Sequence, residues 1–315
     1  MKALEAAVGL ILLTAGTSSP RAGAVGIQMR NVNLLLTNDI VLSVRSLRGE
    51  LERTRSSVPV TFDDSNSFVV DTDSAEIHMT SASLTALMNQ YVFAYERAPI
   101  KEITTTFVGT KLIQTGKIHR AVDLPFRIAA SLSETADGNV RVHAEKIQVE
   151  HLPVKGLLHL LGEDLEKLIH QNPGRGVSVD GDDLILSPAA LTPSPHIHGR
   201  ISRVSVVGDS IVLIFESGRH LPLLTPPFRT AAYIYHRGGV LRFGKLTMND
   251  ADLEIVGDRP GVFSFFQREY QKQLVAGYSK NTRRNGLRAH MADYSHFEPR
   301  DHAEPRSSVL SHGQD

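Results

Sequence analysis

The sequence predicts a β-rich α+β fold, in which long twisted antiparallel strands wrap around two short amphipathic helices. Three observations lead to this prediction. Apolar and polar residues alternate along much of the chain, turns containing Gly, Asp and Asn separate the alternating runs, and few stretches show the helical period. With 315 residues, the chain is long enough for one large or two ordinary domains with a sizeable core.

The composition limits the classes of function. The chain has 34 Lys and Arg residues and 34 Asp and Glu residues, which gives a formal net charge of zero. A dedicated nucleic-acid-binding protein normally carries a basic surface, so we do not expect a nucleic acid as the partner. The chain has no cysteine, which excludes disulfides and thiolate metal sites without fixing the compartment.

Residues 1–24 have the features of a signal peptide. Lys2 supplies a positive charge, an apolar run follows from Ala6 to Ala15, and Ala22-Gly23-Ala24 forms a small-residue cleavage site. The apolar run is shorter than the roughly 20 residues that cross a bilayer. We therefore predict cleavage after Ala24 and export to the periplasm or the extracellular space. An amphipathic or anchoring N-terminal helix is the alternative.

Between residues 25 and 149 most segments have the pattern of strands. Strands and hairpins are expected in Val25–Thr54, Ser67–His78, Glu102–His119 and Phe126–Glu145. The last of these alternates most clearly, which predicts a hairpin with one buried and one solvated face. Ser81–Tyr91 interrupts the strands with a short amphipathic helix that Thr80 can cap.

Pro153 to His170 has the most regular helical pattern in the chain. Six apolar residues lie at offsets 0, 3, 4, 7, 11 and 14 and form one stripe: Val154, Leu157, Leu158, Leu161, Leu165 and Leu168. Pro153 suits a first helical turn, and the turn Asn172 to Gly174 ends the segment. Because strands surround this helix in sequence, we expect its stripe to pack on a sheet, as part of a filled core or as the wall of a groove.

The C-terminal half is also predicted to be mainly β. Strand pairs are expected in Gly176–Leu186, Ser202–Glu216 and Thr230–Val256, and a helix in Phe263–Tyr278. The Pro-rich segment Ala189–Pro195 is interpreted as a boundary. The predicted organisation is therefore a β-rich α+β domain at 25–195, a β-rich extension or second lobe at 196–278, and a polar, mostly disordered tail at 279–315.

Motifs that would identify an enzyme are missing from the sequence. It contains no G-x-S-x-G, no Walker A motif and no G-x-G-x-x-G. His196 and His198 would share one face of a strand and could bind a metal if a third ligand converged. The Asp71–Asp73 and Asp180–Asp183 clusters could attract calcium, although hairpin turns favour the same residues. We predict no catalytic residue, metal or cofactor, and the sequence leaves metal binding at the His pair and the Asp180 turn open.

An aromatic face followed by basic residues lies near the C-terminus. Phe266 and Tyr270 share one face of the predicted helix, and Lys280, Arg283 and Arg284 follow it. Such a combination suits peripheral contact with an anionic membrane. A helix that packs on the core and is followed by a solvated tail is the alternative.

The order of elements resembles that of a known family. A signal peptide precedes twisted strands, helices at Ser81–Tyr91 and Pro153–His170, and the strand-turn-strand unit GVSVDGDDLIL. Over Val25 to Phe215 this resembles the exported LmeA-like (DUF2993) phospholipid-binding proteins and, more distantly, the tubular lipid-binding fold. The resemblance implies no catalytic residues and an apolar cavity that accepts acyl chains. The residues expected to line it are Leu84, Leu87, Met88, Phe126, Ile128, Val142, Leu157, Leu158, Leu161, Leu165 and Leu168.

These observations lead to one expected function and two alternatives. We expect an exported, non-catalytic protein of the bacterial cell envelope that binds a phospholipid or another acyl-chain ligand. One alternative is a structural or interaction β-protein with a solid core. The other is an exported hydrolase whose site residues converge only in the fold. An open apolar tunnel would favour the first, a filled interior the second, and a cleft with two carboxylates or a His-centred cluster the third.

Overall fold

The computed structural model describes residues 23–95, 98, 100–119, 123–149, 176–180, 183–228 and 230–296. The predicted helix Pro153–His170 and nearly all of the predicted signal peptide lie outside these residues. In the described part the chain is rich in antiparallel strands with short helices, which confirms the β-rich α+β prediction. None of the helices in these residues is long and apolar enough to cross a membrane.

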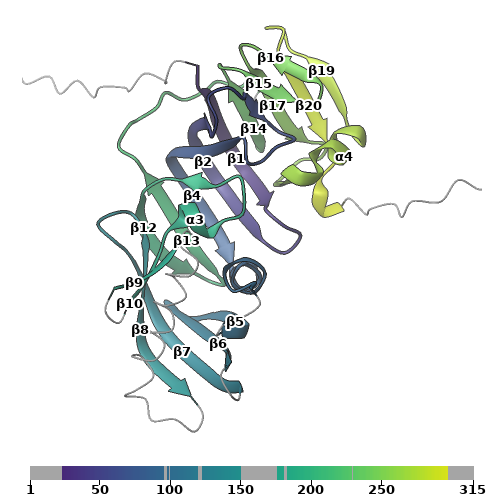
Figure 1. Cartoon of the computed structure of the whole chain (residues 1–315). Helices are drawn as coiled ribbons and strands as arrows, with labels where there is room; N and C mark the ends of the chain where they lie inside the picture. The colour runs from purple at the N-terminus through teal and green to yellow at the C-terminus, as the bar shows by residue number, and fades with distance from the viewer. Residues whose placement is uncertain are drawn as a thin grey trace, which may run out of the picture.

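An eleven-stranded sheet forms the body of the molecule (Figure 1). Its strands lie in the order β12 (Ile201–Val207), β13 (Ser210–Glu216), β4 (Phe68–Thr80), β2 (Val41–Arg53), β1 (Val25–Leu35), β14 (Tyr233–Arg237), β17 (Asp252–Gly257), β20 (Leu287–Met291) and β19 (Tyr278–Asn281). Two further strands attach to it, β11 (Ile197–His198) beside β4 and β18 (Phe263–Phe266) beside β1.

Two smaller sheets and several short helices complete the fold. The six-stranded sheet has the order β5 (Ile100–Val108), β6 (Lys111–His119), β7 (Asp123–Glu134), β8 (Val140–Val149), β10 (Asp183–Leu186) and β9 (Val177–Asp180). The three-stranded sheet has the order β16 (Leu246–Met248), β15 (Leu241–Phe243) and β3 (Val60–Thr61). The helical segments are α1 (Ser81–Leu87), η1 (Met88–Val92), α3 (Pro188–Leu191), η3 (Gln267–Glu269), α4 (Tyr270–Val275) and η4 (Tyr294–His296).

The long strands β2 and β4 form the centre of the large sheet and shift register twice along their length. One shift follows Arg48, where Gly49 lies against the backbone of β4. A Cβ atom on Gly49 would lie 2.4 Å from the carbonyl oxygen of Asp71, so only glycine fits this close approach. The shift bends the sheet and lets its two faces bury different kinds of side chain.

Helix α1 connects the large sheet to the six-stranded sheet. It begins directly after β4, where the Thr80 side chain accepts a hydrogen bond from the Ser83 backbone N–H, as the sequence predicts. In η1, which follows α1 directly, the Asn89 side-chain amide donates to the Ile103 carbonyl at 2.6 Å and accepts from the Ile103 N–H at 2.9 Å. These contacts fix β5 against the helix, which is dark blue and seen end-on between the two sheets in Figure 1.

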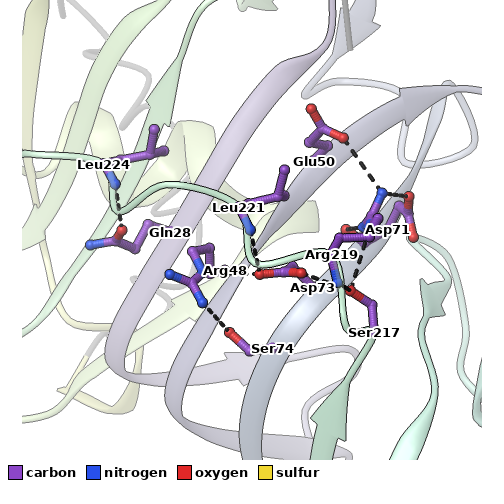
Figure 2. Close-up of polar contacts among 10 residues, drawn as sticks. All are labelled: Gln28, Arg48, Glu50, Asp71, Asp73, Ser74, Ser217, Arg219, Leu221 and Leu224. Atoms are coloured by element: carbon purple, nitrogen blue, oxygen red, sulfur yellow. Dashed lines mark hydrogen bonds and ion pairs between the residues drawn. The ribbon is translucent and has the colours of Figure 1, made fainter. Parts of the chain in front are cut away.

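The predicted boundary near residue 195 lies within one continuous sheet. Strands β12 and β13 extend the sheet beside β4, whereas β14 and β17 extend it on the other side of β1. Residues 217–228 and 230–232, called here the strap, lie between β13 and β14 and cross the sheet (Figure 2). Proline residues fit the strap because it lacks the regular backbone pairing of a strand. The strap connects two strands of the same sheet.

Two predictions for the C-terminal part are wrong. Phe263–Tyr278 does not form a single helix, because its first four residues are buried and pair with β1 as strand β18 before η3 and α4 begin. The described part of the predicted disordered tail contains β19 and β20, and Ala289 and Met291 are completely buried beside β17, whereas residues 297–315 of the tail lie outside the described residues. In β20 the basic side chains alternate with the apolar ones, and pairing with β17 provides the burial that local composition does not reveal.

Candidate functional site

An apolar cavity of about 190 Å³ lies between the large sheet, the six-stranded sheet and helix α1. Thirty described residues line it, and all but Gln114, Asp183 and Thr192 are apolar. The large sheet contributes Ile77, Met79, Ile211, Leu213 and Phe215. Because these residues alternate along their strands, one face of β13 and the end of β4 next to α1 form the wall.

The opposite wall comes from the hairpin β7–β8, whose strands pair from Phe126 to Glu134 and from Val140 to Val149. Inward-facing residues of the hairpin include Phe126, Ile128, Leu132, Val142 and Ala144. The intervening residues, such as Arg127 and His143, are exposed on the other face. This is the one-sided burial that the alternating sequence of this hairpin predicts.

Every described residue that the sequence nominates for the cavity lines it. These residues are Leu84, Leu87, Met88, Phe126, Ile128 and Val142. The other nominated residues, Leu157, Leu158, Leu161, Leu165 and Leu168, lie outside the described part of the chain. Sequence reasoning missed the wall formed by the large sheet. Its signal is the period-two spacing of Ile211, Leu213 and Phe215, which predicts a buried face but does not say which space the face borders.

The acidic residue of the lining directs its charge away from the cavity. Asp183 pairs with His143 across the sheet, while the neighbouring Leu184 pairs with Val142. Its carboxylate contacts His143 Nδ1 and Arg141 Nη1, each at 2.6 Å. The hydrogen bond from His143 and then that from Arg141 hold the pKa of Asp183 below its usual range. The ionised carboxylate therefore lies on the outer face of the sheet.

A row of Ser131, His143 and Asp183 crosses this outer face and must be considered as a hydrolase site. Ser131 pairs with His143 in the sheet register, and His143 pairs with Asp183. The Ser131 hydroxyl, however, hydrogen-bonds Glu145, whose pKa is lowered chiefly by Lys111 and also by Ser131. Around His143, at Val140–His143, strand β8 is paired on both sides, so the backbone N–H groups there bond neighbouring strands and are not free to form an oxyanion hole. The row does not have the geometry of a catalytic triad.

The Asp71–Asp73 cluster forms ion pairs that hold the strap in place. Asp73 accepts hydrogen bonds from Arg48 at 3.1 Å, from the Ser217 hydroxyl at 2.7 Å and from the Leu221 N–H at 3.0 Å. Arg219 Nη1 lies 2.8 Å from the Asp71 carboxylate (Figure 2). These carboxylate oxygens therefore have partners within the protein that take the place of a calcium ion.

The other candidate metal ligands do not converge either. His196 precedes the short strand β11 and His198 ends it, and Nδ1 of His196 is buried without a hydrogen-bond partner in the described structure. In the Asp180–Asp183 turn, Gly181 and Asp182 lie outside the described residues. Within the described ranges, no group of three or more His, Asp or Glu side chains is arranged to hold a metal ion.

The aromatic face predicted for membrane contact is inside the protein. Phe266 and Tyr270 are only 7% and 2% exposed. The ring of Tyr270 packs on Phe62, with centroids 5.6 Å apart, and its hydroxyl donates to Asp63 at 2.8 Å. Burial and this hydrogen bond raise the pKa of Tyr270 to about 12. Phe266 is buried within β18 and Tyr270 at the start of α4, so these two side chains are not available to a membrane surface.

Comparisons with known proteins gave no match to a family model, to a curated protein or to a solved structure.

Proposed function

We propose that this protein is an exported, non-catalytic protein of the bacterial cell envelope that binds a lipid acyl chain or a similar hydrophobic ligand. The supporting observation is the cavity between the two sheets and α1, with only three polar residues among thirty. The one charged residue among these directs its carboxylate to the opposite face of the sheet. The proposal agrees with the resemblance to LmeA-like phospholipid-binding proteins.

The size and chemistry of the cavity favour a chain-like apolar ligand over water. An apolar cavity of about 150 Å³ is known to stay dry and to accept small apolar molecules. The cavity here, at about 190 Å³, has a similar lining and more space. An acyl chain gains about 0.8 kcal/mol for each CH₂ group that leaves water. A charged head group would lose far more on entering an apolar site, so we place it at the mouth of the cavity.

The test is native mass spectrometry of the protein purified from a bacterial host, followed by organic extraction and lipid analysis. We expect a co-purifying lipid or fatty acid at close to one molecule per chain. Ala144→Trp should abolish this signal, because Ala144 lines the cavity and the indole would occupy its space. Ala129→Trp is the matched control, since Ala129 lies on the other face of the same hairpin and pairs with exposed Lys146.

Two outcomes would contradict the proposal. A ligand-free mass for the wild-type protein, with no uptake when fatty acid is added, would favour the structural protein with a solid core. Equal lipid content in the wild type and in folded Ala144→Trp would place the lipid elsewhere on the molecule. Each result is read together with thermal unfolding, which shows whether the tryptophan variants are folded.

A further inference from the structure

The C-terminal end of the large sheet has a one-sided charge distribution. Residues 270–292 contain five cations and no Asp or Glu, although the whole chain is formally neutral. The cations are Lys280, Arg283, Arg284, Arg288 and Lys272, the last of which pairs with Glu269 at 2.6 Å. They lie on α4, on the edge strand β19, on its turn to β20 and on β20 itself. This edge is at the opposite end of the molecule from the six-stranded sheet (Figure 1).

Aromatic rings lie beside these cations on the same sheet face. The Tyr278 ring stacks on His290 at 4.3 Å between centroids, and Lys280 Nζ lies 5.2 Å from the Tyr278 ring. Lys280 pairs with Arg288 across the sheet, and the Arg288 guanidinium lies 4.3 Å from the ring of Phe228 in the strap. Tyr278 and Phe228 are nevertheless 50% and 43% exposed. Both rings therefore present apolar surface to the solvent.

Two acidic residues, Glu254 and Asp252, lie beneath this face. Glu254 is completely buried and its carboxylate lies 3.7 Å from Arg288 Nε. Asp252 is 4% exposed and accepts a hydrogen bond from the Tyr235 hydroxyl at 2.9 Å. Burial raises the pKa of the Glu254 carboxyl, and the nearby charge of Arg288 opposes this rise. The outward positive charge comes from the exposed side chains of Lys280, Arg283 and Arg284.

We propose that Phe228, Tyr278, Lys280, Arg283 and Arg284 form a docking face for an anionic lipid bilayer. Aromatic rings with a polar edge settle at the level of lipid head groups. Each cation near an anionic bilayer strengthens binding about fivefold, so the three exposed cations together account for about a hundredfold. The edge position of β19 lets the face approach a flat surface. The proposal does not depend on the cavity, which lies at the other end of the molecule.

The test is flotation of the full chain with vesicles of phosphatidylcholine alone or with about one-third phosphatidylglycerol. We expect binding only to the anionic vesicles, and loss of this binding when NaCl rises from about 0.05 to about 0.5 M. The combined variant Lys280→Glu, Arg283→Glu and Arg284→Glu should bind at least a hundredfold more weakly. The control variant Arg45→Glu, Arg127→Glu and Lys146→Glu makes the same charge change at exposed positions elsewhere. It should lose much less binding.

Several results would overturn the docking face. They are absence of wild-type binding to anionic vesicles, an equal loss in both triple variants, or salt-insensitive binding. Retention on heparin at salt concentrations that abolish vesicle binding would point to another polyanion as the partner. Tyr278→Ala leaves the charges unchanged and should weaken vesicle binding severalfold. Lipid extraction from the charge-reversed variant separates the two proposals, because a filled cavity with failed docking leaves only the cavity proposal standing.

Discussion

The two faces of the central strands bury different kinds of side chain. On one face, Ile77 and Met79 of β4 form part of the wall of the apolar cavity. On the other face, Asp73 of the same strand lies under the strap, where it accepts three hydrogen bonds. One strand therefore borders an apolar space on one side and a fully bonded polar network on the other.

The polar network under the strap extends over neighbouring strands. Gln28 of β1 accepts a hydrogen bond from the Leu224 N–H at 2.9 Å and donates to the Tyr233 hydroxyl. Arg219 lies between Asp71 and Glu50, at 2.8 and 3.6 Å (Figure 2). Hydrogen bonds depend on direction and distance, so this network specifies one path for the strap.

The comparison teaches why only one of the two faces suits a ligand site. Apolar contacts have no fixed direction, and an apolar wall tolerates a change of occupant as long as the space is filled. Removing one partner of a buried carboxylate lowers the stability of the protein by several kcal/mol. A face built from ion pairs therefore does not readily exchange one set of contacts for another. The following predictions test this difference, from the largest expected effect to the smallest.

Removal of the central carboxylate should have the largest effect. Asp73→Ala would leave Arg48, the Ser217 hydroxyl and the Leu221 N–H without their acceptor. We expect the free energy of unfolding in urea to fall by about 3 kcal/mol or more. Asp64→Ala is the control, because Asp64 forms an exposed ion pair with Arg55 and should cost less than about 1 kcal/mol. Similar losses in both variants would show that the strap network is not special.

Acid should lower the free energy of unfolding through protonation of the buried His236. This side chain is 1% exposed, lies edge-on to Phe62 and has no hydrogen-bond partner at either nitrogen in the described structure. Burial lowers the pKa of His236 to about 3 from a usual 6.5. The unfolded chain binds a proton at this histidine more readily than the folded protein does. The contribution of neutral His236 to the free energy of unfolding is therefore complete above pH 6.5 and is lost as pH falls toward 3.

The size of this effect follows from the displacement of the pKa. Each pH unit below 6.5 should cost about 1.4 kcal/mol, or about 2.7 kcal/mol at pH 4.5. Unfolding in urea at several pH values measures it. His236→Phe should remove this part of the pH dependence, whereas replacement of exposed His220 should leave it unchanged. An unaltered pH profile in folded His236→Phe would assign the acid sensitivity to other groups.

The smallest effect is expected when a side chain that borders the cavity is shortened, because its packing is already incomplete. Val142 lines the cavity, whereas Val44 is 1% exposed and is not one of the lining residues. Val44→Ala should lower the free energy of unfolding by about 2 kcal/mol, from lost transfer energy and a new void. Val142→Ala should cost about half as much in ligand-free protein, because part of its surface already borders empty space. Equal costs, measured by urea unfolding, would indicate a filled interior.

Much of the local structure could be predicted from the sequence. The hairpin β7–β8 follows from its alternating residues, and the start of α1 follows from Thr80 and the spacing of Leu84, Leu87 and Met88. The six nominated cavity residues that the structure describes lie on faces whose burial these periods predict. The large-sheet wall, the Ser131–His143–Asp183 row and the strap network were not predicted, because each depends on which strands become neighbours.

The sequence alone determined where strands, turns and the first helix lie, since these depend on residues within a few positions of one another. Tertiary structure decided which faces meet. Asp73 and the Leu221 N–H are 148 residues apart, yet their hydrogen bond fixes the strap. The buried segment Phe263–Phe266 became strand β18 because β1 offered an open edge. Residues 278–291 joined the sheet because β17 offered another open edge. Backbone pairing and side-chain burial depend on partners that local composition does not specify.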